Sequence, residues 1–144
     1  MGENIGDAEN RTPGFQTWLT SSLEAVDEIE LLAADFLRQE HVQVNVFDFR
    51  LIIREALLNA VMHGNHLRAD KHVDFRIKID PEAVYIRIID EGRGFDWNSA
   101  LNGDPDSMGQ SGRGLVIMKE YAQQIIYNQK GNDITLKINR GRRS

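Results

Sequence analysis

The feature that most constrains the fold is a strict alternation of apolar and polar residues in the second half of the chain. The segment VDFRIKI (73–79) alternates in this way, and AVYIRII (83–89) repeats the pattern after a turn at 80–82. A third run, ITLKI (134–138), follows the turn at 130–133. A period of two predicts strands with one buried and one solvated face. Such strands need a second layer to cover their apolar side.

Helical patterns supply that layer. Apolar residues recur at helical spacing from a cap at Ser21 or Ser22 to about residue 40. After a second candidate cap at Asn45, a helix over 46–63 is apolar on nearly every side, as expected for a helix covered by other elements. The remaining predicted elements are a strand over 15–20, a helix over 114–123 and a strand near QIIYN (124–128).

Together these elements predict an α/β (α+β) two-layer sandwich, a mixed or antiparallel sheet with helices on one face. The length of 144 residues suits one domain. Residues 1–14 are polar, with three glycines and a proline, and are expected to form a flexible leader. The domain is expected over 15–139, and residues 140–144 form a short basic tail.

Composition narrows the function classes. The formal net charge of -5 argues against a non-specific grip on nucleic acid or on an anionic membrane. It leaves a nucleotide possible, because backbone N–H groups and a metal can hold phosphates. The absence of cysteine excludes disulfides and thiolate metal sites. No apolar run approaches the roughly 20 residues of a membrane span, and no signal pattern opens the chain, so a cytoplasmic protein is expected.

Three polar residues interrupt the apolar helix over 46–63. Glu55, Asn59 and His63 stand at i, i+4 and i+8, which places them on one line along one face. One interpretation is a helix edge that reaches solvent, with Glu55 paired to Arg54 or Arg50. The other is functional, because an amide oxygen suits Mg²⁺ and a carboxylate one turn away can accept a proton. Gly64 is expected at the C′ position that ends the helix.

Two glycine-rich turns follow. Asp90-Glu91-Gly92-Arg93-Gly94 comes directly after a strand, where tight turns admit a flat ligand and an Asp carboxylate can accept a hydrogen bond from an amine such as that of adenine. Ser111-Gly112-Arg113-Gly114 opens a helix, and such a start offers free N–H groups to an anion. The polar stretch from Asn98 to Gln110 joins the two turns, and the whole segment 90–113 is predicted as a loop. The length of the polar stretch 98–110, between the two turns, favours a lid over a nucleotide.

The order of these pieces resembles the Bergerat ATP-binding fold of the GHKL superfamily, and most closely the anti-sigma factor serine kinases of the RsbW/SpoIIAB type. EALLNAVMHGN matches the N-box of that family, DEGRGFD its first glycine box and SGRGLVIM its second. GNDITLKI matches its last pair of strands. The resemblance covers about residues 15–139.

The resemblance implies roles for these residues. Glu55 would be the general base for phosphoryl transfer to a serine, Asn59 would hold Mg²⁺ and Asp90 would bind the adenine amine. The ATP-binding positions it implies are Asn59, Asp90, Gly92, Gly94, Ser111, Gly112, Arg113, Gly114 and Leu115. The implied partners are a sigma factor and a small STAS anti-anti-sigma protein that supplies the acceptor serine, and the implied assembly is a homodimer.

The sequence departs from the family pattern at two places. Gln110 stands where a basic residue is common before the second glycine box. Asn132-Asp133 replace a threonine near the adenine, which leaves the detail of base recognition open.

Other functions remain to be weighed beside the kinase. A nucleotide-gated adaptor would sequester a partner without phosphorylating it. The catalytic domain of a histidine kinase is less well supported, because the first helix carries no phosphoacceptor histidine. A metal-only hydrolase is disfavoured, since His41, His63, His66 and His72 make no persuasive ligand cluster. The chain could also be part of a larger regulator.

Overall fold

The computed structural model describes residues 12–103 and 112–141. Along the chain the elements are β1 (Gly14–Thr20), α2 (Leu23–Gln39), α3 (Val46–Leu58), the π-helix η1 (Asn59–Gly64), β2 (His72–Ile79), β3 (Ala83–Asp90), α4 (Trp97–Asn102), α5 (Gly112–Tyr121), β4 (Ala122–Tyr127) and β5 (Asp133–Asn139). None of the helices in these ranges is long and apolar enough to cross a membrane.

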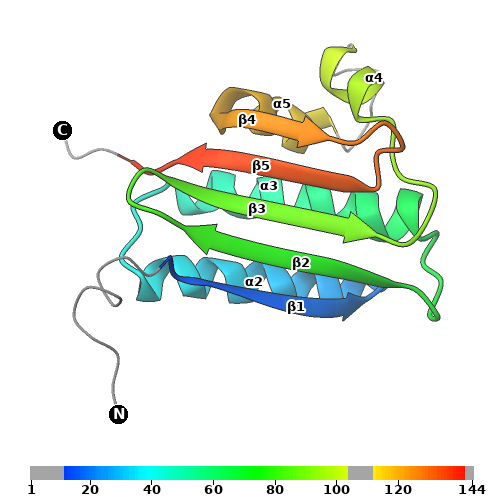
Figure 1. The fold of residues 1–144 in the computed structure, drawn as a ribbon, viewed down its shortest axis with the longest axis horizontal. Coiled ribbons are helices and arrows are strands. Elements are labelled where there is room, and N and C mark those ends of the chain that lie inside the picture. Colours follow the sequence, from blue (N-terminus) through cyan, green and yellow to red (C-terminus); the bar gives the residue numbers. More distant parts are fainter. Residues whose placement is uncertain (1–11, 104–111, 142–144) are drawn as a thin grey trace.

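The described strands form one sheet of five, in the order β1-β2-β3-β5-β4, and every neighbouring pair is antiparallel. In Figure 1 the strands lie in front, and α2, α3 and α5 lie behind them as a single layer. The predicted two-layer sandwich is therefore confirmed, in its antiparallel form. Alternation is confirmed as well, since the pairs Phe75–Ile88 and Ile77–Ile86 are buried under the helices.

The core lies between the two layers. Its largest fully buried side chains come from both, with Phe75, Ile77, Ile86, Ile88 and Leu136 on the sheet and Val26, Leu37, Ile52, Ile53, Leu57, Val61 and Met118 on the helices. Full burial of one such side chain stabilises a fold by roughly 1.5–3 kcal/mol.

Both predicted helix caps form. The Ser22 hydroxyl accepts a hydrogen bond from the Ala25 N–H at 3.1 Å, and the Asn45 side chain accepts one from the Asp48 N–H at 3.1 Å. Each cap of this type contributes about 1 kcal/mol. Ser21, the alternative cap, is buried and donates instead to the Lys71 carbonyl at 2.8 Å.

Two predictions about the elements were wrong. The helix over 46–63 is not covered along its whole length, because Val46 and Phe47 in its first turn are 52% and 62% exposed. The segment 90–113 is not a continuous loop, because α4 forms within it. Asp96 caps α4, accepting from the Ser99 N–H at 3.1 Å and from the Ser99 hydroxyl at 2.8 Å. Asp is a favoured N-cap residue, a signal that the glycine-rich surroundings obscured.

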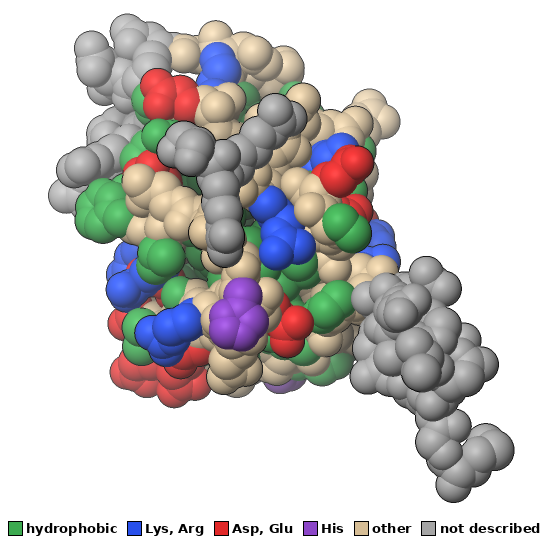
Figure 2. All heavy atoms as spheres, turned by 90° about the vertical axis from the view of Figure 1, so that its left-hand side faces the viewer, with side chains coloured by type: hydrophobic (Ala, Val, Ile, Leu, Met, Phe, Trp, Pro, Cys, Tyr) green, Lys and Arg blue, Asp and Glu red, His purple; other side chains and the backbone are tan. Residues whose placement is uncertain are grey.

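At one end of the sheet, hydrogen bonds link the chain after β5 to the β2–β3 turn and to the segment between α2 and α3. The Arg140 N–H donates to Glu82 at 2.9 Å, its guanidinium donates to the Asp80 carbonyl at 3.0 Å, and the Gly141 N–H donates to Gln43. Figure 2 shows this end of the molecule, where acidic, basic and apolar side chains are interspersed. The polar cluster predicted from the sequence lies at the other end, where β3 terminates.

Candidate functional site

Three segments meet where β3 ends: the π-helix η1, the glycine turn after Asp90 and the turn between β4 and β5. Backbone hydrogen bonds join them. The Arg93 N–H donates to Gly64 at 3.1 Å, the Phe95 N–H donates to Gly131 at 3.1 Å, and the Asp90 N–H donates to Asn132 at 2.8 Å. The first glycine turn is therefore held on both sides, and the residues it carries have defined positions.

Glu55 and Asn59 lie together on α3 and at the start of η1, as the i, i+4 spacing predicts. They are 6% and 1% exposed, and the Asn59 amide donates to Glu55 Oε2 at 3.2 Å. This burial contradicts a helix edge that reaches solvent. Arg50 and Arg54 bind Glu30 on α2, each with one nitrogen at 3.0 Å from a Glu30 oxygen.

The start of α5 lies against Glu55. A Cβ added at Gly114 would stand 2.5 Å from Glu55 Oε1 and 2.7 Å from Glu55 Cβ. Glycine at this position therefore lets the backbone of the second glycine box approach the carboxylate closely. Contact between a helix start and a buried acidic group brings free N–H groups toward the predicted catalytic residue.

The end of the buried helix differs from the prediction. Beyond Leu58 the backbone hydrogen bonds span one residue more than in an α-helix, so that the Asn65 N–H donates to Ala60 at 2.8 Å, and the chain continues as the π-helix η1. Single π turns inside α-helices are frequent at functional sites. His63, the third member of the polar line, is exposed there, and its ring lies 5.3 Å from that of Phe95.

Gly64 is not a left-handed C′ residue, so that prediction was wrong. It lies within η1, and the glycines with positive φ in the described ranges are Gly94 (84°) and Gly131 (82°). Its role is spatial. A Cβ at Gly64 would stand 2.4 Å from the Asp90 carboxyl carbon, and one at Gly92 would stand 1.6 Å from the Gly64 carbonyl oxygen. Glycine at position 64 therefore leaves room for the Asp90 carboxylate, and glycine at position 92 lets the turn pack against the backbone of η1.

Asp90 is the most perturbed group in this region. It is 4% exposed, and its Oδ1 accepts a hydrogen bond from the Gly92 N–H at 2.8 Å. Burial raises the pKa of Asp90 to about 6, while the Gly92 N–H and the positive charges of Lys130 and Lys71 act in the opposite direction. A perturbed carboxyl group in a close-packed turn is a candidate for ligand recognition.

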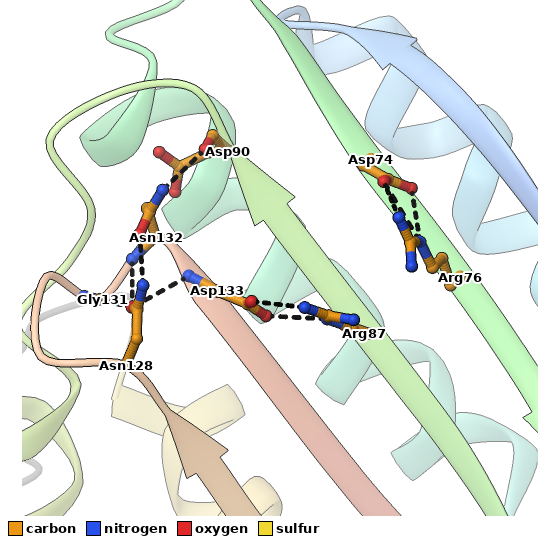
Figure 3. Close-up of polar contacts among 8 residues, drawn as sticks. All are labelled: Asp74, Arg76, Arg87, Asp90, Asn128, Gly131, Asn132 and Asp133. Carbon is orange, nitrogen blue, oxygen red and sulfur yellow. Dashed lines mark hydrogen bonds and ion pairs between the residues drawn. The ribbon is translucent and has the colours of Figure 1, made fainter.

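The turn between β4 and β5 supports Asp90 from the other side (Figure 3). The Asn132 amide donates to the Asp90 carbonyl at 3.1 Å, and the Asn128 amide donates to Asn132 Oδ1 at 2.7 Å. Asn128 Oδ1 in turn accepts from the N–H groups of Gly131 and Asn132 at 2.8 and 3.1 Å. Asn132, which with Asp133 replaces the threonine of the family pattern, thus holds the backbone of Asp90 in place.

Asp133, the other residue at that place, has a different orientation. Its carboxylate forms a two-point ion pair with Arg87, at 3.1 Å and 2.8 Å, on the face of the sheet opposite the helices. Figure 3 shows this pair leading away from Asp90. Asp133 is therefore a structural residue of the sheet surface, and its charge is already compensated.

Asn65 was missed in the sequence. It is fully buried, its amide donates to the Ser21 hydroxyl at 2.8 Å and to the His72 carbonyl at 3.0 Å, and its Oδ1 accepts from the Glu91 N–H at 2.9 Å. One side chain thereby links the start of α2, the start of β2 and the glycine turn. An asparagine after a helix normally marks only a break, so no local pattern reveals this role.

A hollow borders the outer side of the glycine turn. It has a volume of about 620 Å³ and lies between the start of α4 and the β4–β5 turn. Among its lining residues are Arg93, Phe95, Trp97, Tyr127 and Lys130. The Trp97 indole N–H donates to the Gly131 carbonyl at 3.1 Å, and this hydrogen bond links the start of α4 to the β4–β5 turn beside the hollow.

The second glycine box is described only in part. Ser111 and Gln110 lie outside the described residues, as does most of the predicted lid. Gly112 and Arg113 begin α5, Gly114 contacts Glu55, and the Leu115 side chain is 3% exposed in the core. Within 12–103 and 112–141, no three His, Cys, Asp or Glu side chains gather at a spacing suited to a metal ion.

Comparison with known proteins agrees with this arrangement. Residues 19–138 match the family model of the histidine kinase-like ATPase domain. The chain is also 29% identical, over 97 residues, to an anti-sigma F factor of Clostridium beijerinckii, an alignment that covers 63% of this chain and 67% of that protein. The family match spans Glu55, Asn59, Asp90 and both glycine boxes, and an ATPase domain implies ATP binding. This chain belongs to the histidine kinase-like ATPase domain family.

Proposed function

We propose that this domain is an ATP-dependent serine protein kinase and anti-sigma factor, which transfers the γ-phosphoryl group of ATP to a serine of a STAS anti-anti-sigma protein. One observation carries the proposal: a buried carboxylate at Asp90 and a buried Glu55–Asn59 pair lie on adjoining segments of one end of the fold. The similarity to an anti-sigma F factor supports the choice of partners.

Asp90 is proposed to recognise the base. Its carboxylate would accept a hydrogen bond from the exocyclic amine of adenine, and the ionised form accepts more strongly than the protonated form. Gly64 allows the backbone to pack against this carboxylate, Gly92 allows the turn to pack against Gly64, and Gly94 adopts the positive φ that the turn requires. A buried acceptor of this kind discriminates strongly against a base that lacks the donor, because the carboxylate would be left unpaired.

Asn59 is proposed to hold Mg²⁺ through its side-chain oxygen. The Asn59 nitrogen is engaged by Glu55 Oε2, which leaves the amide oxygen as the atom directed elsewhere, and oxygen is the ligand that Mg²⁺ prefers. When bound, the ion would neutralise phosphate charge during transfer. The backbone N–H groups at Gly112, Arg113 and Gly114, with Ser111 and Leu115, are proposed to surround the phosphates.

Glu55 is proposed as the general base. The serine oxygen attacks the γ-phosphorus, the bond to the β–γ bridging oxygen breaks, ADP leaves, and the serine proton passes to Glu55. The hydrogen bond from Asn59 orients this carboxylate, and α5 covers it from the side of Gly114. Positioning and charge neutralisation supply most of the catalysis in phosphoryl transfer.

Replacing Glu55 by Gln tests the assignment. The E55Q variant should bind ATP within about twofold of wild type but transfer phosphate about 10²–10⁴-fold more slowly, the usual contribution of general base catalysis. Calorimetric ATP titration and transfer of labelled phosphate to a STAS protein measure the two quantities. Glu28→Gln, an exposed glutamate on α2, is the matched control.

Two outcomes would redirect the proposal. Unchanged transfer in E55Q would remove Glu55 from its proposed role. ATP binding by the wild-type chain without transfer to any STAS serine would support the nucleotide-gated adaptor instead. We further propose that the domain spans residues 15–139 and that the protein is a cytoplasmic homodimer. Sedimentation equilibrium of the full chain measures the oligomeric state.

A further inference from the structure

The sheet has a second face, which no described element covers. Figure 1 looks onto this face, with all three long helices on the far side. The register aligns its outward residues in rows across the strands. One row contains Trp18, Asp74, Ile89 and Asp133, the next contains Gln16, Arg76, Arg87, Thr135 and Ile126, and a third contains Lys78, Tyr85 and Lys137.

The centre of this face is basic. Arg76, Lys78, Arg87 and Lys137, here called the basic strip, come from β2, β3 and β5. Arg76 and Arg87 are direct cross-strand partners. Like charges at opposed positions destabilise a sheet unless neighbouring groups or a bound anion compensate them.

Structural ion pairs compensate only part of that charge. Asp74 binds Arg76 at 2.8 Å, and Asp133 binds Arg87 at 2.8 Å, yet both guanidinium side chains remain more than two-fifths exposed. Lys137 lies over the Tyr85 ring, its Nζ 5.9 Å from the ring centre. Asp80, at the edge, accepts hydrogen bonds from the N–H groups of Glu82 and Ala83 in its own turn. The basic strip therefore keeps donors for an external anion.

The same face carries exposed apolar groups and a hollow. Trp18 on β1 is 62% exposed and Ile126 on β4 is 54% exposed, so apolar surface flanks the basic strip on both edges of the sheet. A hollow of about 470 Å³ lies over the strip and is lined by Arg76, Lys78, Tyr85 and Arg87, together with Thr12, Asp80 and Thr135. Arginine and aromatic residues are the types enriched in protein interfaces.

We propose that this open face is a docking surface for an acidic segment of a protein partner. Charge complementarity selects the partner, because the basic strip stands in a chain whose net charge is -5. Two copies placed face to face would oppose their basic strips, which disfavours self-association through this surface. Apolar contacts at both sheet edges extend beyond a small anion, and the interspersed Asp74 and Asp133 oppose a nucleic-acid backbone.

The first test uses a probe that needs neither ATP nor the proposed partners. A synthetic peptide rich in Glu, Asp and Leu is titrated into the isotope-labelled full chain, and amide shifts are followed by NMR. Shifts should concentrate on β2, β3 and β5, and should weaken at higher salt. The double variant K78E/K137E should bind the peptide about tenfold more weakly, since it reverses two charges of the basic strip while it leaves the ion pairs of Arg76 and Arg87 in place.

Control variants separate docking from folding. R38E/K119E makes the same change of charge on exposed positions of α2 and α5, and should leave peptide affinity within about twofold. It also removes the exposed ion pair between Arg38 and Asp35, so it controls for charge and not for stability. ATP affinity should match wild type in both double variants, and a cooperative thermal unfolding transition in each should show that it remains folded. Trp18→Ala should also weaken peptide binding, independently of charge.

The second test uses the proposed sigma factor and STAS protein, and for that choice alone it rests on the proposed function. Carbodiimide coupling should join Lys78 or Lys137 to a carboxylate of at least one of them.

Equal peptide affinity in K78E/K137E and wild type would overturn the proposal. So would shifts only on the helical layer, conversion of a dimer to a monomer by K78E/K137E with peptide affinity intact, or a preference for single-stranded DNA over the peptide. A protein that binds the peptide but transfers no phosphate would contradict only the proposed kinase activity.

Discussion

Two aspartates on neighbouring strands show opposite ways to bury a carboxylate. Asp74 on β2 and Asp90 on β3 are 3% and 4% exposed, and each lies one register position from the other's cross-strand partner. Asp74 faces the open side of the sheet, where the Arg76 guanidinium and the Gln16 amide bind it at 2.8 and 3.0 Å. Asp90 faces η1, and its carboxylate receives the Gly92 N–H. Figure 3 shows both.

The difference separates a structural carboxylate from one kept for a ligand. A guanidinium neutralises the charge of Asp74 and uses its oxygens, so the group contributes to stability. Asp90 is desolvated with its cations at a distance, and burial therefore raises its pKa to about 6. An arrangement of this kind lowers the stability of the free protein, and bound ligand can recover the loss.

The largest expected effect comes from closing the space beside Asp90. In Gly64→Ala the new Cβ must displace the Asp90 carboxyl group, from which it would stand 2.4 Å. We expect the free energy of unfolding to fall by about 3 kcal/mol and ATP binding to become undetectable. Urea denaturation and calorimetry measure both. Met62→Ala, an exposed neighbour in η1, should change stability by less than about 0.5 kcal/mol; a similar loss in both variants would contradict the packing argument.

The next effect is a pH dependence specific to Asp90. Because its folded pKa of about 6 lies above the ordinary value of 3.8, the folded chain holds an extra proton between these values. Its contribution to stability is therefore present at low pH and is lost as pH rises through about 6, a change of about 2 kcal/mol between pH 4.5 and 7. Other carboxyl groups also titrate, so the measured quantity is wild type minus Asp90→Asn. A difference that does not change with pH would show that Asp90 titrates normally.

ATP affinity should depend on pH in the opposite sense to stability. It should rise as pH increases through about 6, since the ionised carboxylate is the stronger acceptor for the adenine amine. Asp90→Asn should weaken ATP binding about 10–100-fold at neutral pH, as expected for loss of a charged hydrogen bond of about 1.5–3 kcal/mol. Asp74→Asn should lower the unfolding free energy by about 1–2 kcal/mol and leave ATP affinity within about twofold. If Asp74→Asn weakened ATP binding more than Asp90→Asn does, Asp74 would be the ligand-binding aspartate and Asp90 the structural one.

The smallest effect tests the support of Asp90. Asn132→Ala removes the hydrogen bond to the Asp90 carbonyl and the partner of the Asn128 amide. Stability should fall by about 1 kcal/mol and ATP affinity by about fivefold, because the carboxylate remains but is held less firmly. Asn139→Ala, on the exposed end of β5, is the control. Equal ATP affinity in wild type and Asn132→Ala would show that Asn132 stabilises the β4–β5 turn without affecting ATP binding.

Much of the fold was predictable because its signals are local. The alternation in 73–79 and the caps at Ser22 and Asn45 depend on residues close in the chain, and all three were confirmed. Errors arose where distant segments decide. Gly64, in the π-helix η1, packs against Asp90, which lies at the end of β3 and far away in the sequence. The helix α4 formed where a glycine-rich stretch predicted only loop.

The candidate site divides in the same way. Spacing alone placed Glu55 and Asn59 on one face of a helix, and three ordered motifs indicated the ATPase family, because helical geometry and turn chemistry act over a few residues. Only the tertiary structure decided that Asn65 joins three elements, that Asn132 supports Asp90 while Asp133 binds Arg87, and that Gly114 lies on Glu55. Burial and contact between segments far apart in sequence create those roles, and a linear pattern carries no measure of either.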